Sequence, residues 1–495
     1  MSAQPHYDVV VVGAGFAGIG AAIKLDEAGF KNFIVLEEGD GIGGAWHWNT
    51  YPGVAVDIPS FSYQFSFAQR SDWSRIYAPG NELKAYAEDL VDGYGLRSRI
   101  KLNARVVGQE FDEAAHTWRV VTEAGEEFTS RYVIDATGVI TQPKIPDIKG
   151  LGDFAGPAIH TARWDHRVDL TGKRVAVIGT GASSVQVVPA IASEVDHVIV
   201  FQRTPVWCLP KADVAITGKA RFAVQRIPGA RRIGRLLALL LGETLLVLAV
   251  HYAGKFPRVS RKVEELARKN MGQANDPDVR AKLTPDYTIG CKRHTASSEY
   301  PAIFNRDNVH LETKPIDTVK PGGIHLADGT KHEVDIIILA TGFKGFEKGN
   351  MPPFPVLGVD GTDLTDWWDE NRYQAYQGVS IPTFPNYFMT FGPYGYNGAS
   401  YFHFIETQMR HIPRCLKHAR KTQTTRVEVT RTANERYFAS VLKRRRNQVF
   451  FTGNCATSNS HYFDKHGDVP FRPSTSIETL VRSATFRLNA YSFTK

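Results

Sequence analysis

Hydrophobic residues in this chain fall into short β-branched runs, each followed by a glycine-rich turn and a helical pattern. The run Tyr7–Val12 is apolar at consecutive positions, which is typical of a strand buried on both faces of a parallel sheet. Helical spacing then continues to Ala28, Gly29 closes the helix, and Phe33–Leu36 gives a second strand. The pattern predicts a β-α-β unit near the N-terminus.

The same layout occurs a second time in the chain. Arg174–Ile178 predicts a strand, a helix follows to about Ala192, and His197–Phe201 predicts the next strand. Two further apolar runs, Tyr132–Asp135 and Ile336–Leu339, each lead into an Ala-Thr-Gly sequence. We therefore expect an α/β protein with two Rossmann-like dinucleotide-binding domains.

One apolar segment leaves two interpretations open. Residues 236–250 read LLALLLGETLLVLAV and follow the basic stretch 231–235. The segment includes Glu243 and is shorter than the roughly 20 residues that a helix needs to cross a bilayer. It is either a buried helix or lid, or an interfacial helix through which residues 231–252 contact a membrane peripherally.

Both glycine-rich turns follow a predicted strand and open a predicted helix, which is the context that a dinucleotide-binding loop requires. The glycines allow the tight turn and the close approach of a pyrophosphate, and the helix N-terminus offers unpaired N–H groups. The second loop has a serine in the third glycine position. The expected cofactor contacts are Gly13, Gly15, Ala17 and Gly18 in the first loop, and Gly179, Thr180, Gly181, Ala182, Ser183 and Ser184 in the second.

The residue after the second strand of each unit distinguishes the two cofactors. Glu37 stands as far along the chain from Gly13 as Arg203 stands from Gly179. A carboxylate accepts hydrogen bonds from a free ribose 2′-hydroxyl, as in FAD, whereas an arginine pairs with the 2′-phosphate of NADPH. The sequence therefore predicts FAD on the first unit and NADPH on the second.

These cofactors suggest a division of the chain into domains. Residues 1–145 and 375–495 are expected to bind FAD, and residues 150–211 and 286–370 to bind NADPH. The charge-rich stretch 212–285 is expected to form a helical insertion.

The four cysteines argue against one class of flavoprotein. Cys208, Cys291, Cys415 and Cys455 include no Cys-x-x-Cys pair, so we expect neither a metal site nor a disulfide framework. Disulfide reductases need a cysteine pair beside the flavin, and no cysteine precedes Cys208. The N-terminus also lacks the basic-then-apolar layout of a signal peptide, and together these features are typical of a cytoplasmic protein.

The net charge of +8 does not by itself indicate nucleic-acid binding. The basic residues are scattered apart from short runs such as 443–446, and no nucleic-acid-reading module accompanies them. A basic protein also suits a polyanionic cofactor.

The segment just before the second loop matches a family fingerprint. Phe154, Gly156, His160, Trp164 and Asp165 fit every spacing of Phe-x-Gly-x-x-x-His-x-x-x-Trp-Pro/Asp, the pattern of type I Baeyer–Villiger monooxygenases within the flavin-containing monooxygenases. Related enzymes that oxidise nitrogen or sulfur usually carry Tyr or Phe in place of Trp164. The chain therefore resembles the Baeyer–Villiger family, in which this motif lies on a linker that serves domain movement.

A second family pattern is present with one departure. Gly-Gly-x-Trp at 43–46, Tyr-Pro-Gly at 51–53 and Asp57 all match, and Thr284–Arg293 resembles the family segment that bears adjacent Lys and Arg. Residues 54–56 read Val-Ala-Val, where the family usually has Ala-Arg-Cys. This leaves a detail of cofactor or substrate contact open.

The resemblance implies that NADPH reduces FAD, O₂ adds to the flavin, and a peroxyflavin attacks a ketone to give an ester or lactone. It implies that Arg293 is a catalytic cation that stabilises the peroxide and the oxyanion of the adduct, with Asp57 paired to it. Lys292 is expected to join Arg203 and Thr204 around the 2′-phosphate. The resemblance adds cofactor contacts at Gly44, Ala45, Trp46, Asp57, Tyr63, Val106 and Arg293. It does not assign His160 as a general base.

Two other functions remain open from the sequence. A flavin monooxygenase that oxidises nitrogen or sulfur shares most of these motifs. A degenerate nucleotide-binding or membrane-associated interaction protein is disfavoured because the motifs are intact. The apolar insertion and the aromatic loop Tyr373–Phe404 suggest that the ketone is hydrophobic.

Overall fold

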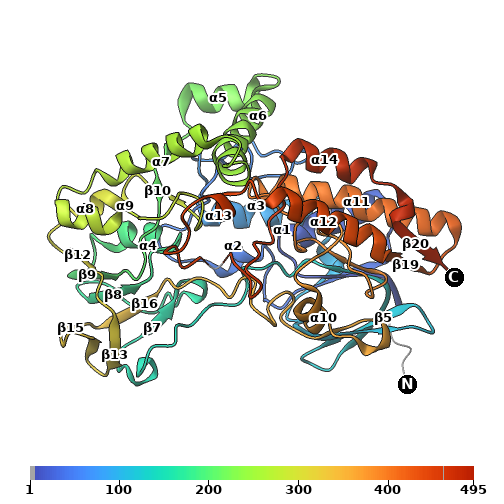
Figure 1. The fold of residues 1–495 in the computed structure, drawn as a ribbon, viewed down its shortest axis with the longest axis horizontal. Coiled ribbons are helices and arrows are strands. Elements are labelled where there is room, and N and C mark those ends of the chain that lie inside the picture. Colours follow the sequence, from blue (N-terminus) through green and yellow to red (C-terminus); the bar gives the residue numbers. More distant parts are fainter. Residues whose placement is uncertain (1–5, 461) are drawn as a thin grey trace.

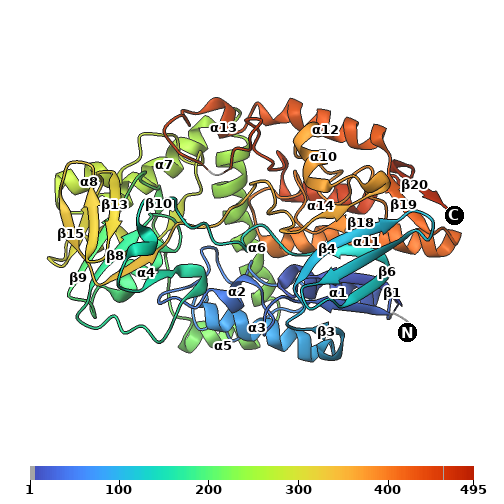
Figure 2. The same cartoon turned by 90° about the horizontal axis from the view of Figure 1, so that it is seen from below.

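The computed structural model describes residues 6–460 and 462–495, in which the two largest β-sheets are separate and flanked by helices. The sheets lie at opposite ends of the molecule, and the helix α6 (Ala230–Gly242) runs between them (Figures 1 and 2). Residues 1–5, on which the reading of the N-terminus partly rests, lie outside the described residues.

The first sheet is built around β1 (His6–Val12), which lies between β2 (Phe33–Leu36) and β6 (Glu127–Asp135) and runs parallel to both. Val9–Val11 are fully buried, which explains why this strand is apolar at consecutive positions. The order is β17-β4-β5-β6-β1-β2-β3, and β18 pairs with β6. The remaining strands of this sheet are β3 (Ile100–Lys101), β4 (Val106–Asp112), β5 (Thr117–Thr122), β17 (Val356–Leu357) and β18 (Tyr387–Met389).

The second sheet is parallel throughout, in the order β12-β9-β8-β16-β7. A three-stranded antiparallel sheet of β13, β14 and β15 adjoins it at the left of Figure 1. The parallel strands are β7 (Ala158–His160), β8 (Arg174–Ile178), β9 (His197–Phe201), β12 (Val309–Glu312) and β16 (Ile336–Leu339). The antiparallel strands are β13 (Ile316–Lys320), β14 (Gly323–Leu326) and β15 (Lys331–Glu333).

The two halves repeat the same local construction at their loops. Gly13 has φ +102° and Gly179 has φ +116°, and a side chain at either would clash with a backbone carbonyl oxygen. That carbonyl belongs to Ala136 for Gly13 and to Ala340 for Gly179. Both alanines begin an Ala-Thr-Gly sequence, so each loop is held against the end of a neighbouring strand.

Helices cover both sheets, and one group of them forms the insertion. The helix α1 (Phe16–Glu27) packs against α11 (Tyr401–Thr422), where the rings of Phe16 and Phe402 lie 4.6 Å apart. Within 212–285 the structure has α5, α6, the π-helix η4, α7 and α8, so the helical character predicted for this stretch is confirmed. These insertion helices are α5 (Gly218–Arg226), α6, η4 (Glu243–His251), α7 (Pro257–Met271) and α8 (Pro277–Leu283); the other helices are α2 (Ala45–Trp48), α3 (Gly80–Gly93), α4 (Ser184–Ile191), α9 (Tyr300–Ile303), α10 (Leu364–Asn371), α12 (Arg431–Arg445), α13 (Val449–Thr452) and α14 (Ser476–Thr485).

The sequence predicts no disulfide framework, but one disulfide bond that it did not indicate is present. Cys291 and Cys455 are disulfide-bonded across a sequence separation of 164 residues, with Cα atoms 5.2 Å apart. Sequence spacing could not reveal this bond, because only the fold returns the C-terminal segment to the residues that precede Lys292. Cys208 and Cys415 are free and buried.

A paired substitution in the second loop separates folding from cofactor binding. Gly179→Ala places a side chain against the Ala340 carbonyl at a positive φ, so we expect it to lower the free energy of unfolding by about 1–3 kcal/mol or more. A side chain at Gly181 meets no atom within 4 Å, so Gly181→Ala should leave that free energy unchanged and weaken NADPH binding instead. Denaturant unfolding and NADPH titration measure the two effects, and equal destabilisation by both variants would contradict the assignment.

Candidate active site

The first loop is oriented by a buried carboxylate. Glu37 is 4% exposed, and its side chain accepts the N–H of Ala14 at 2.6 Å and the N–H of Gly39 at 2.9 Å. Burial raises the pKa of Glu37, and these two hydrogen bonds oppose that rise. Gly15 precedes α1 and provides no side-chain cap, so the helix N-terminus keeps N–H groups for a pyrophosphate. The arrangement fits FAD.

The rest of the predicted first-loop residues lie close to Glu37 and Gly15. Ala17 and Gly18 are in the first turn of α1, and a side chain at Gly18 would overlap the Gly13 carbonyl. Val106 begins β4 and is buried, next to the Ala104 N–H, which donates to the Glu37 backbone carbonyl at 2.7 Å. A cavity of about 670 Å³ lies beside this edge, with Glu38, Trp48, Asn103, Arg105 and Arg163 among its lining residues.

The Gly-Gly-x-Trp motif places an aromatic pair against the first loop. A side chain at Gly44 would lie 2.9 Å from the Gly15 Cα atom, so the two backbones touch. Ala45 is exposed at the start of α2, and the Trp46 indole N–H donates to the Tyr63 hydroxyl at 3.0 Å. The indole and phenol rings meet edge to face, with centroids 5.6 Å apart. This rigid pair can form one wall of a flavin site.

The second loop has an equally open helix start. Ser183 precedes α4 without a side-chain cap, and the space beside Gly181 is open. Ala182 is partly exposed and Ser184 is buried, so the loop residues differ in how much they face a ligand. The Thr180 hydroxyl donates to the Thr204 carbonyl at 2.8 Å and ties the loop to the end of β9. These features fit a pyrophosphate on α4.

Two cations and a threonine gather where the 2′-phosphate of NADPH is expected. Burial, and then the neighbouring charge of Arg203, lower the pKa of Lys292 to about 8. Arg203 itself is exposed. Thr204 is buried, and its hydroxyl accepts a hydrogen bond from the Asn459 side chain at 2.8 Å. Two neighbouring cations repel each other, and a dianionic phosphate between them would relieve that repulsion.

Arg293 and Asp57 form the ion pair that the sequence predicts. A guanidinium nitrogen of Arg293 donates to Asp57 Oδ2 at 2.5 Å, across 236 residues of sequence. Burial raises the pKa of Asp57, but the charge and hydrogen bond of Arg293 outweigh it, so the net shift is downward. Asp57 in turn raises the pKa of Arg293. The Arg293 side chain remains 47% exposed and is therefore accessible to a ligand.

Several residues around this pair were missed by sequence reasoning. Tyr396 and Tyr462 both interact electrostatically with Arg293, and Lys211 contributes to lowering the pKa of Asp57. Burial, and then Arg293, lower the pKa of His294 to about 4, so His294 is neutral at neutral pH. Only Tyr396 carried a sequence signal, because it belongs to the aromatic loop Tyr373–Phe404.

A glutamine that sequence reasoning also missed holds the Tyr-Pro-Gly motif against α4. The Gln186 side chain accepts the Tyr51 hydroxyl at 2.8 Å and donates to the Ala55 carbonyl at 3.0 Å. A side chain at Gly53 would lie 2.6 Å from the Gln186 carbonyl oxygen, which explains the glycine. Because Ala55 is held through its backbone, Val-Ala-Val at 54–56 is compatible with the same loop path to Asp57.

The family fingerprint surrounds the edge strand of the second sheet. Phe154 packs on the cluster that contains Ala176 and Ile178, and Trp164 packs on the cluster that contains Val175 and Val177. Since successive residues of β8 face opposite sides, the two aromatic rings cover opposite faces of the sheet. The motif is therefore partly built into the sheet, through β7.

The other fingerprint residues support this edge. A side chain at Gly156 would overlap the Asp335 carbonyl, so a glycine is needed there. His160 ends β7, and its Nδ1 accepts the Ala162 N–H at 3.0 Å. Burial lowers the pKa of His160 to about 4, which makes it a poor general base at neutral pH. Asp165 is paired with Arg167 at 2.8 Å at the surface.

Comparisons with known proteins identify the family of the chain. A family model described as pyridine nucleotide-disulphide oxidoreductase matches residues 10–223. A Baeyer-Villiger monooxygenase of Streptomyces coelicolor is 38% identical over 482 residues, which cover 96% of this chain and 90% of that protein. The chain belongs to the Baeyer–Villiger monooxygenases.

Solved structures support the same family and its cofactors. Cyclohexanone monooxygenase from Rhodococcus sp. Phi1 bound to NADP⁺ matches with a TM-score of 0.87 and 27% identity, covering all of both chains. A complex of OTEMO with FAD and NADP matches with a TM-score of 0.86 and 27% identity, covering 99% of this chain and 100% of that chain. The protein is therefore an FAD- and NADPH-dependent flavoprotein with two Rossmann-type domains. The comparisons favour ketone oxygenation over oxidation of nitrogen or sulfur.

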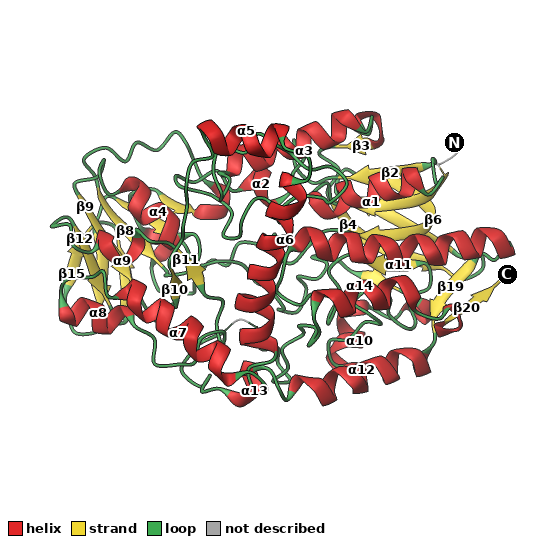
Figure 3. Ribbon diagram, turned by 90° about the horizontal axis from the view of Figure 1, so that it is seen from above, coloured by secondary structure: helices red, strands yellow, loops and turns green. Residues whose placement is uncertain are grey.

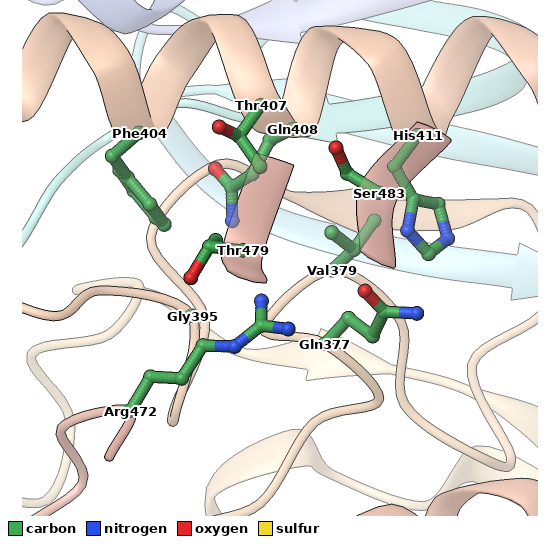
Figure 4. Close-up of a pocket in the computed structure, with 10 residues that line it drawn as sticks. All are labelled: Gln377, Val379, Gly395, Phe404, Thr407, Gln408, His411, Arg472, Thr479 and Ser483. Atoms are coloured by element: carbon green, nitrogen blue, oxygen red, sulfur yellow. The ribbon is translucent and has the colours of Figure 1, made fainter. Parts of the chain in front are cut away.

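A second pocket in this Baeyer–Villiger monooxygenase does not suit a ketone. It lies beneath α11, and Arg472, Gln377 and Thr479 are among the residues that line it (Figure 4). The space is too small for a water molecule, so it cannot hold an organic substrate. The open surface at Arg293 is the better candidate for the ketone.

The lowered pKa of Lys292 predicts that NADPH binding depends on pH. Lys292 is charged below about pH 8 and neutral above it, so we expect KM for NADPH to rise as the pH increases through about 8. Lys292→Arg should remove the rise, because arginine stays charged throughout this range. Steady-state kinetics between pH 7 and pH 9.5 test this, and a flat wild-type profile would contradict a phosphate contact by Lys292.

Proposed function

We propose that Arg293 and Asp57 are the catalytic pair of an enzyme that inserts one oxygen atom of O₂ next to the carbonyl group of a ketone, giving an ester or lactone. The main support is their hydrogen-bonded contact, which fixes an exposed, permanently charged guanidinium at one place. When bound, FAD supplies oxygen activation after it has accepted a hydride from NADPH.

Arg293 acts through its charge. Negative charge develops on the ketone oxygen when the carbonyl carbon is attacked, and a fixed guanidinium stabilises that charge without reorganising. Asp57 orients Arg293 and remains ionised because its pKa is lowered. Lys211 adds positive charge on the Asp57 side. His294, which follows Arg293, is neutral at neutral pH and adds no charge beside the pair.

The cofactors are placed by the two repeated loops. We assign FAD to residues 1–145 and 375–495, with Glu37 at the ribose and the Trp46–Tyr63 pair at the flavin. We assign NADPH to residues 150–211 and 286–370, with Lys292, Arg203 and Thr204 at the 2′-phosphate. The uncapped starts of α1 and α4 support these assignments.

Removing the guanidinium should separate flavin reduction from oxygen insertion. Arg293→Ala should bind FAD and be reduced by NADPH, but its ester formation should fall by about 10²–10³-fold because the developing charge is no longer stabilised. Arg293→Lys should recover part of the activity, and Asp57→Asn should lose less than Arg293→Ala. Stopped-flow reduction and product analysis by mass spectrometry measure both steps. Ester formation by Arg293→Ala at the wild-type rate would refute the role of Arg293.

We propose that His160 positions the backbone at the end of β7 and does not transfer protons. It fixes the Ala162 N–H at the end of β7, beside β16. We expect His160→Ala to slow turnover while FAD stays bound. The pH profile of kcat near neutrality should keep its wild-type shape. Flavin content, NADPH consumption and the pH profile of kcat provide the readouts. Unchanged product formation would argue against this role.

The ketone is proposed to be hydrophobic, and residues 231–252 are proposed to contact a membrane from the cytoplasm. Among the described residues, one helix, Ala230–His251, is long and apolar enough to cross a membrane. Arg235 within it donates to the Gln64 carbonyl at 2.5 Å, and Glu243 accepts the Ser476 N–H at 3.1 Å. These bonds hold the helix to the protein, which supports a helix that lies on the membrane rather than one that crosses it.

A further inference from the structure

The helix Ala230–His251 has two halves with opposite burial. In its first half, α6, five large apolar side chains are between 42% and 61% exposed. They are Ile233, Leu236, Leu237, Leu240 and Leu241. Their spacing places them on one side of the helix, which in a surface helix of a globular protein normally faces the core. In α6 this stripe faces outward instead.

Contacts on the inner face of α6 fix the rotation of the helix about its own axis. Arg235 is buried, and its guanidinium lies 3.5 Å from the Glu406 carboxylate in addition to its bond to Gln64. Gly234 lies against the Phe61 ring, where a side chain would be 3.3 Å from the ring atoms. Turning the leucines inward would leave Arg235 and Glu406 without these contacts, so the outward stripe is a fixed feature of the fold.

Positive charge surrounds the exposed stripe. Residues 217–235 contain six basic residues and no acidic residue. All except Arg235 are exposed. They are Lys219, Arg221, Arg226, Arg231, Arg232 and Arg235. The helices α5 and α6 project together from the upper edge of the molecule in Figure 1. An apolar stripe beside a basic cluster is the pattern that anionic lipid surfaces bind.

The same charge argues against a second copy of the chain on this surface. Two copies meeting through the stripe would bring their basic clusters together, and like charges at an interface oppose association. Phe222 and Ile227 of α5 are also 63% and 53% exposed, so the apolar surface continues beyond α6. An anionic bilayer accommodates both the apolar and the basic part.

The second half of the helix, η4, reaches the catalytic segment. Val250 lies against Gly290, where a side chain would be 2.9 Å from a Val250 methyl group. Val250, Ile289 and Cys291 belong to one buried cluster, directly before Lys292 and Arg293. Partly buried Tyr396 and Tyr462 pack against the same cluster, and both interact with the charge of Arg293.

The first half of the helix reaches the flavin side of the site. Phe61 and Gln64, which contact α6, flank Tyr63 in sequence. Tyr63 is the hydrogen-bond partner of Trp46. One helix therefore carries the exposed stripe, contacts residues on both sides of Tyr63 in sequence and packs on the segment before Arg293. Figure 3 shows α6 running between the two sheets.

We propose that this helix is a membrane-seated gate, through which the enzyme takes apolar ketones that are dissolved in an anionic lipid bilayer. The proposal rests on the ketone-oxygenating function and names its substrate class. Ketones with a long alkyl chain or a large ring body partition into lipid, and the helix joins the exposed stripe to the buried cluster that precedes Arg293.

The first experiment measures binding to vesicles by flotation. We expect the wild-type holoenzyme to float with vesicles of phosphatidylcholine and phosphatidylserine in equal parts, and much less with phosphatidylcholine alone. Leu237→Glu should reduce flotation at least tenfold, and Leu240→Glu provides a second variant on the same stripe. Ile145→Glu is the matched control, because Ile145 is 59% exposed against 61% for Leu237 and lies outside the stripe. Equal flotation of wild type and both stripe variants would overturn the proposal.

The second experiment measures delivery with the same proteins. Each is given a short, water-soluble cyclic ketone in buffer and a long-chain methyl ketone dissolved in the mixed vesicles. The stripe variants should keep wild-type activity on the soluble ketone and lose at least tenfold on the vesicle-dissolved ketone. Wild-type activity of both variants on the vesicle-dissolved ketone would overturn delivery. If the wild-type enzyme forms ester from neither ketone, the oxygenating function fails instead, and the flotation result still stands on its own.

Discussion

The contact between Arg293 and Asp57 is the constraint on which the rest of the site depends. Asp57 comes from the loop between α2 and α3, and Arg293 comes from the segment that leaves the helical insertion. These two segments are 236 residues apart in the chain and must meet at the same point. Gln186 fixes the approach of the first loop, and the buried cluster around Cys291 fixes the approach of the second. The ion pair can therefore form only when the two segments are packed correctly.

Much of the fold could be read from local patterns. The bounds predicted for β2, β8, β9 and β16 are those observed, and β1 begins one residue earlier than predicted. These strands are buried on both faces, so their sequences carry an unbroken apolar signal. The three-residue strand β18 was not predicted within the aromatic loop Tyr373–Phe404, because it is too short to show a pattern and is formed by pairing with β6.

The sequence predicted only those active-site residues that belong to a family motif. The pairing of Arg293 with Asp57 came from a resemblance, since neither residue differs locally from a surface charge. Gln186, Asn459 and Lys211 belong to no motif and become visible only when distant segments meet. The disulfide between Cys291 and Cys455 was missed for the same reason. For helix α6 the apolar pattern was evident in the sequence, but the pattern did not show which face of the helix is buried.

The segment that contains Cys455 and Asn459 has a consequence for the order in which the protein is made. It bonds covalently to the residue before Lys292, and it supplies the hydrogen bond to Thr204. Both contacts support the proposed 2′-phosphate site of Lys292, Arg203 and Thr204. Cys455 and Asn459, however, lie in the last tenth of the chain. Almost the whole chain must therefore be synthesised before the 2′-phosphate site can be completed. Until then, the growing chain can fold its first loop but cannot yet hold the second nucleotide in its finished site.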